Sequence, residues 1–143
     1  IPKIAEAVGP EEAAENMAPW LGRERAVFRA EKELSFSKHG EAWDYLLALV
    51  RGYEHRIPTI DHGEYRIIEA MDRYGVAHHA YLGYKRKSDV YDQYLKDVEL
   101  IRDGKVNGVV WHFFRRTGKT EYGPAPELER LLRQAGIMIV IHS

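Results

Sequence analysis

The sequence predicts an α/β domain in which a mixed central sheet is flanked by helices. Residues 65–84 contain two β-capable runs on either side of residues 72–75, which favours an antiparallel hairpin that turns near Gly75, with a helix over residues 67–75 as the alternative. Residues 88–142 then alternate amphipathic and continuously apolar stretches, the pattern of strands connected by crossover helices. A hairpin followed by parallel strands makes the sheet mixed.

Length, charge and composition narrow the class further. With 143 residues the chain has a common size for one domain, so we expect a single domain over residues 1–143. The 21 basic and 22 acidic residues give a net charge of -1, so any nucleic-acid surface must be local. The absence of cysteine excludes thiolate zinc sites and leaves His, Asp and Glu as metal ligands. No apolar run approaches the roughly 18 residues of a membrane-spanning helix, so we expect no membrane segment.

The first part of the chain is predicted to be helical and then to turn. Residues 1–35 are rich in Ala and Glu, and Pro10 before two glutamates suits a first helical turn, so this part is predicted as one or two helices. Residues 40–52 place apolar side chains at offsets of three and four and predict a core-facing helix that stops near Gly52. In residues 53–66, Pro58 and the polar residues after it indicate turns rather than a regular element.

The second half of the chain has clearer boundaries. Ser88 is predicted to cap an amphipathic helix that ends near Gly104. Residues 106–114 have two apolar faces and predict an inner strand. A turn region leads to a short helix that stops at Gly136, and residues 137–142 predict a second buried strand.

The predicted hairpin holds the main candidates for chemistry. Glu69 closes an apolar run, where a carboxylate could hold a divalent cation or simply face solvent. His79 could act as a base or ligand, and because neighbours on a strand point to opposite faces, only one of His78 and His79 can face a site. His62, in a loop beside carboxylates, is a second candidate base or part of a solvated turn. Glu41, in the first turn of a helix, adds a carboxylate or serves the helix dipole.

Positive charge gathers in two short clusters, with three tyrosines nearby in the sequence. The basic residues are Lys85, Arg86, Lys87, Arg115, Arg116 and Lys119, and the tyrosines are Tyr81, Tyr84 and Tyr91. Such a combination can bind phosphates and stack on bases. We therefore expect a local nucleic-acid surface at these clusters, with a solvated charged loop as the alternative.

The last part of the chain resembles a known family. The residues that match are the strand WHFF, the turn TGK, the GP before the last helix and the stretch from AGI to IH. In this order they are similar to the end of the C-terminal toxin domains of bacterial polymorphic toxins, including contact-dependent inhibition and Rhs-type effectors. Those with a restriction-endonuclease-like fold match best. The resemblance covers residues 95–142 well and about the preceding 30 residues loosely.

This resemblance implies a nuclease toxin that hydrolyses phosphodiester bonds of DNA or RNA. Such a toxin is secreted or delivered by a bacterium, acts in the cytoplasm of the target cell and is bound by an immunity protein. In the family, an acidic residue ends one hairpin strand and a Glu-x-Lys follows on the next. These positions fall on Glu69 and on residues 79–81, where His79 and Tyr81 replace the glutamate and the lysine.

The resemblance thus implies a metal-dependent mechanism in which Glu69 and His79 bind Mg²⁺ or Mn²⁺. Glu41 would assist, and Lys85 would stabilise the developing phosphorane charge in place of the missing lysine. Two alternatives stay open. His79 or His62 could act without a metal as base on a ribose 2′-hydroxyl, with Tyr81 and Lys85 on the phosphate. The domain could also have lost its catalytic set and bind only an immunity or carrier protein.

Overall fold

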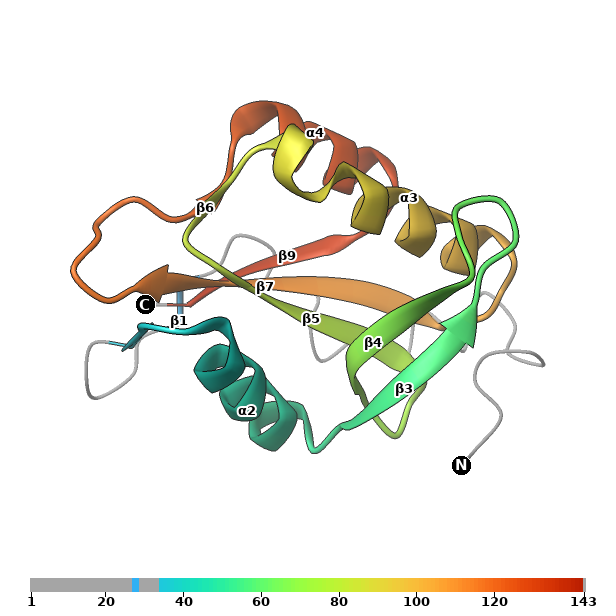
Figure 1. The fold of residues 1–143 in the computed structure, drawn as a ribbon, viewed down its shortest axis with the longest axis horizontal. Helices are drawn as coiled ribbons and strands as arrows, with labels where there is room; N and C mark the ends of the chain where they lie inside the picture. Colours follow the sequence, from blue (N-terminus) through green and yellow to red (C-terminus); the bar gives the residue numbers. More distant parts are fainter. Residues whose placement is uncertain (1–26, 29–33, 143) are drawn as a thin grey trace.

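The computed structural model describes residues 27–28 and 34–142 of the chain (Figure 1). Its elements follow in this order: β1 (Val27–Phe28), β2 (Ser35–Phe36), α2 (His39–Val50), β3 (Tyr53–Pro58), β4 (Tyr65–Met71), β5 (Val76–Leu82), β6 (Tyr84–Lys85), α3 (Lys87–Arg102), β7 (Gly108–Arg116), β8 (Gly123–Pro124), α4 (Pro126–Gln134) and β9 (Met138–His142). No helix in this part of the chain is long and apolar enough to cross a membrane.

A curled mixed sheet forms the centre of the molecule. Its strand order is β1-β9-β7-β5-β4-β3, and β2 pairs with the end of β7. Strand β4 is antiparallel to both neighbours, whereas β5, β7 and β9 are parallel to one another. Helix α2 lies on one face, and α3 and α4 lie on the other (Figure 1). This arrangement confirms the predicted mixed sheet flanked by helices.

Strand β7 is the inner strand that its sequence predicts. Trp111 and Phe113 are fully buried in the core on the α3 and α4 side, where they meet Leu128 of α4. Phe114 belongs to the smaller cluster under α2, together with Leu46. Because alternate residues of a strand point to opposite faces, one apolar run supplies both cores.

The two long helices lie near the predicted positions, with small changes at their ends. Arg51, rather than Gly52, takes the left-handed conformation after α2, with φ 52°. Gly52 is needed for another reason, because a Cβ there would lie 3.0 Å from the Met71 carbonyl oxygen. Helix α3 begins at Lys87, so Ser88 lies inside it. The Asp89 carboxylate accepts the Arg86 N–H at 2.8 Å and thereby caps the first turn.

The expectation of turns throughout residues 53–66 is wrong for the first six of these residues. Strand β3 pairs antiparallel with β4 along the edge of the sheet. An edge strand needs only one row of backbone hydrogen bonds, so Pro58 is tolerated at its end. The alternation of Tyr53, His55 and Ile57 is the signal for this strand in the sequence.

The predicted helical N-terminal part, residues 1–35, is wrong where the structure describes it. Val27–Phe28 forms β1, which pairs in parallel with β9, and Ser35–Phe36 forms β2 on β7. Both segments add to open positions of the sheet, where main-chain pairing outweighs the weak helical preference of two residues. The remainder of that prediction, residues 1–26 and 29–33, lies outside the described residues.

Candidate active site

The candidate site lies where β4 and β5 separate. Their pairing consists of Ala70 with His78 and Met71 with Ala77, while β5 continues along β7 to Leu82. Beyond this point two side chains occupy the edge of β5 in place of β4. The Ala80 N–H donates to Glu69 Oε1 at 2.7 Å, and the Ala80 carbonyl accepts from His39 Nε2 at 3.0 Å. Side chains therefore satisfy backbone groups that a sheet ladder would otherwise pair.

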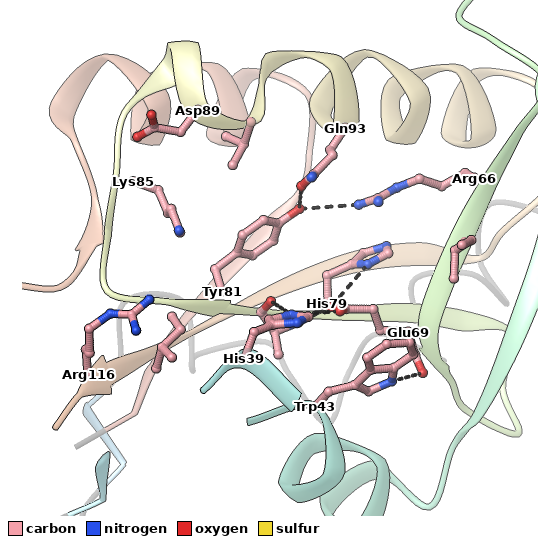
Figure 2. Close-up of a pocket in the computed structure, with 14 residues that line it drawn as sticks. His39, Trp43, Arg66, Glu69, His79, Tyr81, Lys85, Asp89, Gln93 and Arg116 are labelled. Carbon is pink, nitrogen blue, oxygen red and sulfur yellow. Dashed lines mark hydrogen bonds and ion pairs between the residues drawn. The ribbon is translucent and has the colours of Figure 1, made fainter. Parts of the chain in front are cut away.

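A cavity of about 380 Å³ opens beside this gap, between α2 and α3 (Figure 2). Its lining includes His39 and both halves of the hairpin, and it extends to the ends of β6 and β7. The residues most relevant to chemistry are His39, Glu69, His79, Tyr81, Lys85 and Arg116. Four of the five residues predicted as catalytic thus meet in one cavity.

Glu41, the fifth, has a different role. Its Oε1 accepts the backbone N–H groups of Ser37 at 3.2 Å and Lys38 at 2.9 Å, which caps α2. It is not among the residues that line the cavity. In the cavity, His39 takes the place of the acidic residue that the helix was expected to supply, and it lies two residues before Glu41 at the start of α2.

His39 has a defined tautomer. Its Nε2 lies 2.8 Å from Glu69 Oε2 and 3.0 Å from the Ala80 carbonyl oxygen, so Nε2 faces two acceptors and must hold a proton. Nδ1 is then the nitrogen that takes up and releases a proton. The side chain is 48% exposed, so this exchange can involve solvent or a bound substrate. The hydrogen bond to Glu69 raises the pKa of His39 above its ordinary value, although partial burial opposes this.

Glu69 is ionised over the whole physiological range. Burial disfavours its charged form, but the hydrogen bond with His39 and the proximity of the His79 imidazole outweigh burial and lower the pKa of Glu69 to about 2. Its backbone is fixed as well, because Trp43 Nε1 donates to the Glu69 carbonyl at 2.8 Å. A permanently charged, immobilised carboxylate thus orients the imidazole of His39.

His79 is buried between two carboxylates, and only 1% of its side chain is exposed. Its Nδ1 lies 3.8 Å from Glu69 Oε1 and its Nε2 lies 3.6 Å from Asp97 Oδ2. Both distances exceed a hydrogen bond, and neither nitrogen has another partner among the described residues. His78 points to the opposite face, where it contacts Asp72 and His112. As predicted, only one of the two adjacent histidines faces the cavity.

Tyr81 is a hydrogen-bond donor rather than a base. Arg66 Nη2 donates to its oxygen at 3.3 Å, and its own O–H donates to Gln93 Oε1 at 2.8 Å. Burial raises the pKa of Tyr81 far above its ordinary value. Asp97 holds the Arg66 guanidinium with both oxygens, at 2.9 and 3.2 Å. This fully buried pair fixes the wall of the cavity next to α3.

The predicted nucleic-acid residues divide into two groups. Lys85 and Arg116 line the cavity, and Gly83, with φ 85°, gives the turn after β5 that brings Lys85 back over it (Figure 2). The others lie at the same end of the parallel strands, outside the cavity. There Arg86 pairs with Asp89, Lys87 lies 3.5 Å from Glu127, and Arg115 precedes Arg116 at the end of β7. The carboxyl ends of parallel strands are a common place for ligands.

The donor set does not fit a preformed magnesium or manganese site. Within the described residues no group of three or more His, Asp and Glu side chains is placed to hold a metal. Both oxygens of Glu69 already accept hydrogen bonds. His79 could provide only a buried nitrogen ligand, whereas Mg²⁺ prefers oxygen ligands. We therefore derive no step through the metal ion that the resemblance implies.

Several residues of the site, among them Trp43 and Arg66, were not predicted from the sequence. His39 precedes the predicted helix and has no neighbouring motif. Asp97 gives a signal, because it lies on the apolar face of α3, where a buried charge requires a partner. Gln93 lies one turn before Asp97, and nothing in the sequence marks it.

No protein-family model, curated protein or solved structure matches this chain. The chemistry of the cavity therefore follows from its own residues: an oriented imidazole, a fixed carboxylate and two cations. Together these groups can move a proton and bind an anion.

Proposed function

We propose that this protein is a nuclease that cleaves RNA by acid–base catalysis at His39. The observation that supports this most is the 2.8 Å contact between His39 Nε2 and Glu69 Oε2 in a cavity that also contains Lys85 and Arg116. An imidazole held by a carboxylate is a common general base, and cations are the usual partners of a phosphate.

The reaction uses the ribose as its own nucleophile. His39 Nδ1 takes the proton of a 2′-hydroxyl, and the 2′ oxygen forms a bond to the adjacent phosphorus. The bond from phosphorus to the 5′ oxygen breaks, and that oxygen takes a proton from solvent. The products are a 2′,3′-cyclic phosphate and a 5′-hydroxyl. Lys85 and Arg116 stabilise the charge that develops on the nonbridging oxygens.

The proposal includes the restriction-endonuclease-like fold that the sequence resemblance implies. A mixed sheet with helices on both faces supports it, as does a candidate site built on the β4–β5 hairpin. At the family's catalytic positions this chain has Glu69, His79 and Tyr81. Two histidines and a tyrosine around one carboxylate suit proton transfer better than metal binding.

In this proposal the biological role is that of a delivered bacterial toxin with an immunity protein. Expression inside a bacterium is expected to stop growth, and His39→Gln is expected to restore it. Normal growth with the wild-type chain, together with tight binding of a protein partner, would instead favour the alternative of a domain that has lost its activity.

The cleavage assay compares RNA with DNA of the same sequence in the presence of a chelator. We expect cleavage of RNA alone, and a loss of about 10²- to 10⁴-fold in His39→Gln, which keeps a donor for Glu69 but no base. His62→Gln is the matched control, because His62 lies outside the cavity, and it is expected to retain full activity. Cleavage that requires added Mg²⁺ or Mn²⁺ would contradict this mechanism and favour the metal-dependent one.

A further inference from the structure

A second cavity adjoins the first. It has a volume of about 430 Å³ and lies between the start of β4 and the outer side of α3. It shares Arg66, Ile67 and Gln93 with the first cavity. The two cavities thus have one common wall, so a chain molecule that reacts in the first can continue into the second.

The hydrogen bonds in this wall run from Arg66 to Tyr81 and from Tyr81 to Gln93. An arginine has donors and no acceptor, so the Tyr81 oxygen must accept the bond from Arg66 Nη2. The phenolic proton of Tyr81 is donated to Gln93 Oε1 at 2.8 Å. Asp97 anchors this series by holding Arg66 through two hydrogen bonds. The carboxamide of Gln93 is therefore fixed in one of its two orientations.

The fixed orientation leaves the Gln93 NH₂ group with both protons available. No described residue accepts a hydrogen bond from it. Figure 2 shows the Gln93 side chain reaching from α3 to the Tyr81 hydroxyl, beside Arg66. A half-buried donor of fixed direction, where two cavities meet, is suited to recognise an acceptor on a ligand.

The lining of the second cavity suits a nucleobase better than a phosphate. Glu64 and Asp92 bring negative charge. The two cations of the lining are already paired, Lys96 with Asp92 at 3.5 Å and Arg66 with Asp97 at 2.9 Å. Carboxylates repel phosphate but accept hydrogen bonds from ring N–H and amino groups. Tyr65 adds a partly exposed aromatic ring. The Arg56 guanidinium covers one face of this ring at 4.5 Å from its centroid, so a base can stack only on the other face.

We propose that the second cavity binds the base of a nucleotide next to the cleaved phosphodiester, and that Gln93 selects this base by donating a hydrogen bond to it. That the ligand is RNA rests on the proposed function, whereas base selection by Gln93 rests on the hydrogen bonds among Arg66, Tyr81 and Gln93. Tyr81, predicted as catalytic, acts here as a positioning residue that orients Gln93.

The test measures base preference in cleavage of an RNA library of random sequence. We expect the wild type to prefer certain bases at one position beside the cut. Gln93→Glu keeps an acceptor for the Tyr81 hydroxyl but replaces the donor with an acceptor, so the preference at that position should change toward bases that present donors. Tyr81→Phe frees the carboxamide and should weaken the preference by about three- to tenfold. Tyr94→Phe removes a hydroxyl from the same helix outside both cavities and should leave the preference unchanged.

A binding measurement separates this inference from the proposed function. Affinities of four short RNAs that differ in one base are measured by fluorescence anisotropy in His39→Gln, with and without Gln93→Glu. A changed order of affinities supports selection by Gln93 even if the wild type cleaves no RNA, in which case only the proposed function fails. An unchanged order of affinities, an unchanged cleavage preference in Gln93→Glu, or the absence of RNA binding would overturn the inference.

Discussion

At the scale of single residues, His39 owes its chemistry to two contacts from different elements. The side chain of Glu69 and the carbonyl of Ala80 both face Nε2, so the proton stays there and Nδ1 remains basic. Neither contact is local in sequence, since the two strands lie about 30 and 40 residues after the histidine. Tertiary contacts thus hold the His39 imidazole in one tautomer and leave Nδ1 to accept a proton.

This geometry predicts the pH dependence of cleavage. The base form of His39 is required, and Glu69 raises the pKa of His39 above its ordinary 6.5, so kcat/KM should rise with pH and reach half its maximum above pH 6.5. Glu69→Gln removes the negative charge and should lower this midpoint, because partial burial and Lys85, which both lower the pKa of His39, are then opposed only by the hydrogen bond to the Ala80 carbonyl. The same midpoint in both proteins would show that another group is the base.

At the scale of elements, α3 is fixed to β4 by the buried pair of Asp97 and Arg66. Trp111 of β7 also donates to Asp97 Oδ2 at 2.9 Å, so one carboxylate joins a helix and two strands. Arg66 lowers the pKa of Asp97 despite complete burial, which would otherwise raise it. The wall of both cavities depends on this contact.

Removal of the negative charge of Asp97 should therefore lower the stability of the fold strongly. Asp97→Asn leaves the Arg66 guanidinium buried without its counter-charge, and we expect a loss of about 3–5 kcal/mol in the free energy of unfolding. Asp92→Asn on the same helix breaks an exposed pair with Lys96 and should change stability by less than about 1 kcal/mol. Denaturant unfolding measures both, and equal effects would contradict the importance of the buried pair.

The other face of the sheet contains a chain of buried histidines. His78 Nε2 donates to Asp72 Oδ2, His78 Nδ1 lies 2.9 Å from His112 Nε2, and His112 Nδ1 lies 2.9 Å from His142 Nε2. With His78 Nε2–H donating to Asp72, Nδ1 of a neutral His78 is an acceptor, and it accepts a hydrogen bond from His112 Nε2. In the same way, His112 Nδ1 accepts a hydrogen bond from His142 Nε2. One neutral tautomer is thus repeated across β5, β7 and β9.

Acid should weaken the fold through this chain. Burial lowers the pKa of His78 below 6.5, although Asp72 opposes this, so below pH 6.5 the unfolded chain binds more protons than the folded one. The free energy of unfolding should therefore fall as pH decreases through that range. The raised pKa of His39 has the opposite effect on the pH dependence of stability. The free energy of unfolding should therefore be measured against pH in the His39→Gln variant. There His78→Gln should reduce the slope, and an unchanged slope would contradict the prediction.

The elements show how far the sequence alone predicts the fold. The β4–β5 hairpin and the order α3, β7, α4, β9 follow from apolar periodicity and glycine stops. Strand β3 was not predicted although its residues alternate, because only Ile57 is fully buried and Pro58 follows it as a turn signal. The start of α3 differs as well, since pairing of β6 with β8 fixes the backbone just before Lys87. Strand β3 and the start of α3 thus depend on strand pairing between distant residues, which a local sequence pattern does not reveal.

At the scale of the whole molecule, charge is distributed unevenly around a net value of -1. The carboxyl ends of β5 and β7 lead to Lys85 and Arg116, with Arg86, Lys87 and Arg115 beside them. Lys105 lies at the opposite end of β7, where that strand begins. RNA should therefore bind at one end of the sheet.

The salt dependence of RNA binding tests this distribution. Binding to a single strand should weaken with salt in proportion to the phosphates that the protein neutralises, and Lys85→Ala should reduce the slope of log K against log salt by about 0.7. Lys105→Ala at the other end of the molecule should leave the slope unchanged. A similar reduction in both variants would indicate nonspecific attraction.

The candidate site could be predicted only in part. Glu69, His79, Tyr81 and Lys85 lie within one hairpin and its following turn, so they are close in sequence and in space. His39, Asp97 and Gln93 come from two helices on opposite faces of the sheet, and only the packing of those helices brings them to the gap between β4 and β5. His39, the proposed base, therefore could not be predicted from the sequence pattern.

The chemical structure of the product ends tests the central claim most directly. A short RNA is incubated with the protein in chelator, and the fragments are analysed by mass spectrometry. We predict a 2′,3′-cyclic phosphate upstream and a 5′-hydroxyl downstream, with no cut at a position where a single 2′-deoxy nucleotide replaces the ribose. Fragments with 5′-phosphate ends that form only with added Mg²⁺ or Mn²⁺, and that also form at the deoxy position, would contradict catalysis by His39.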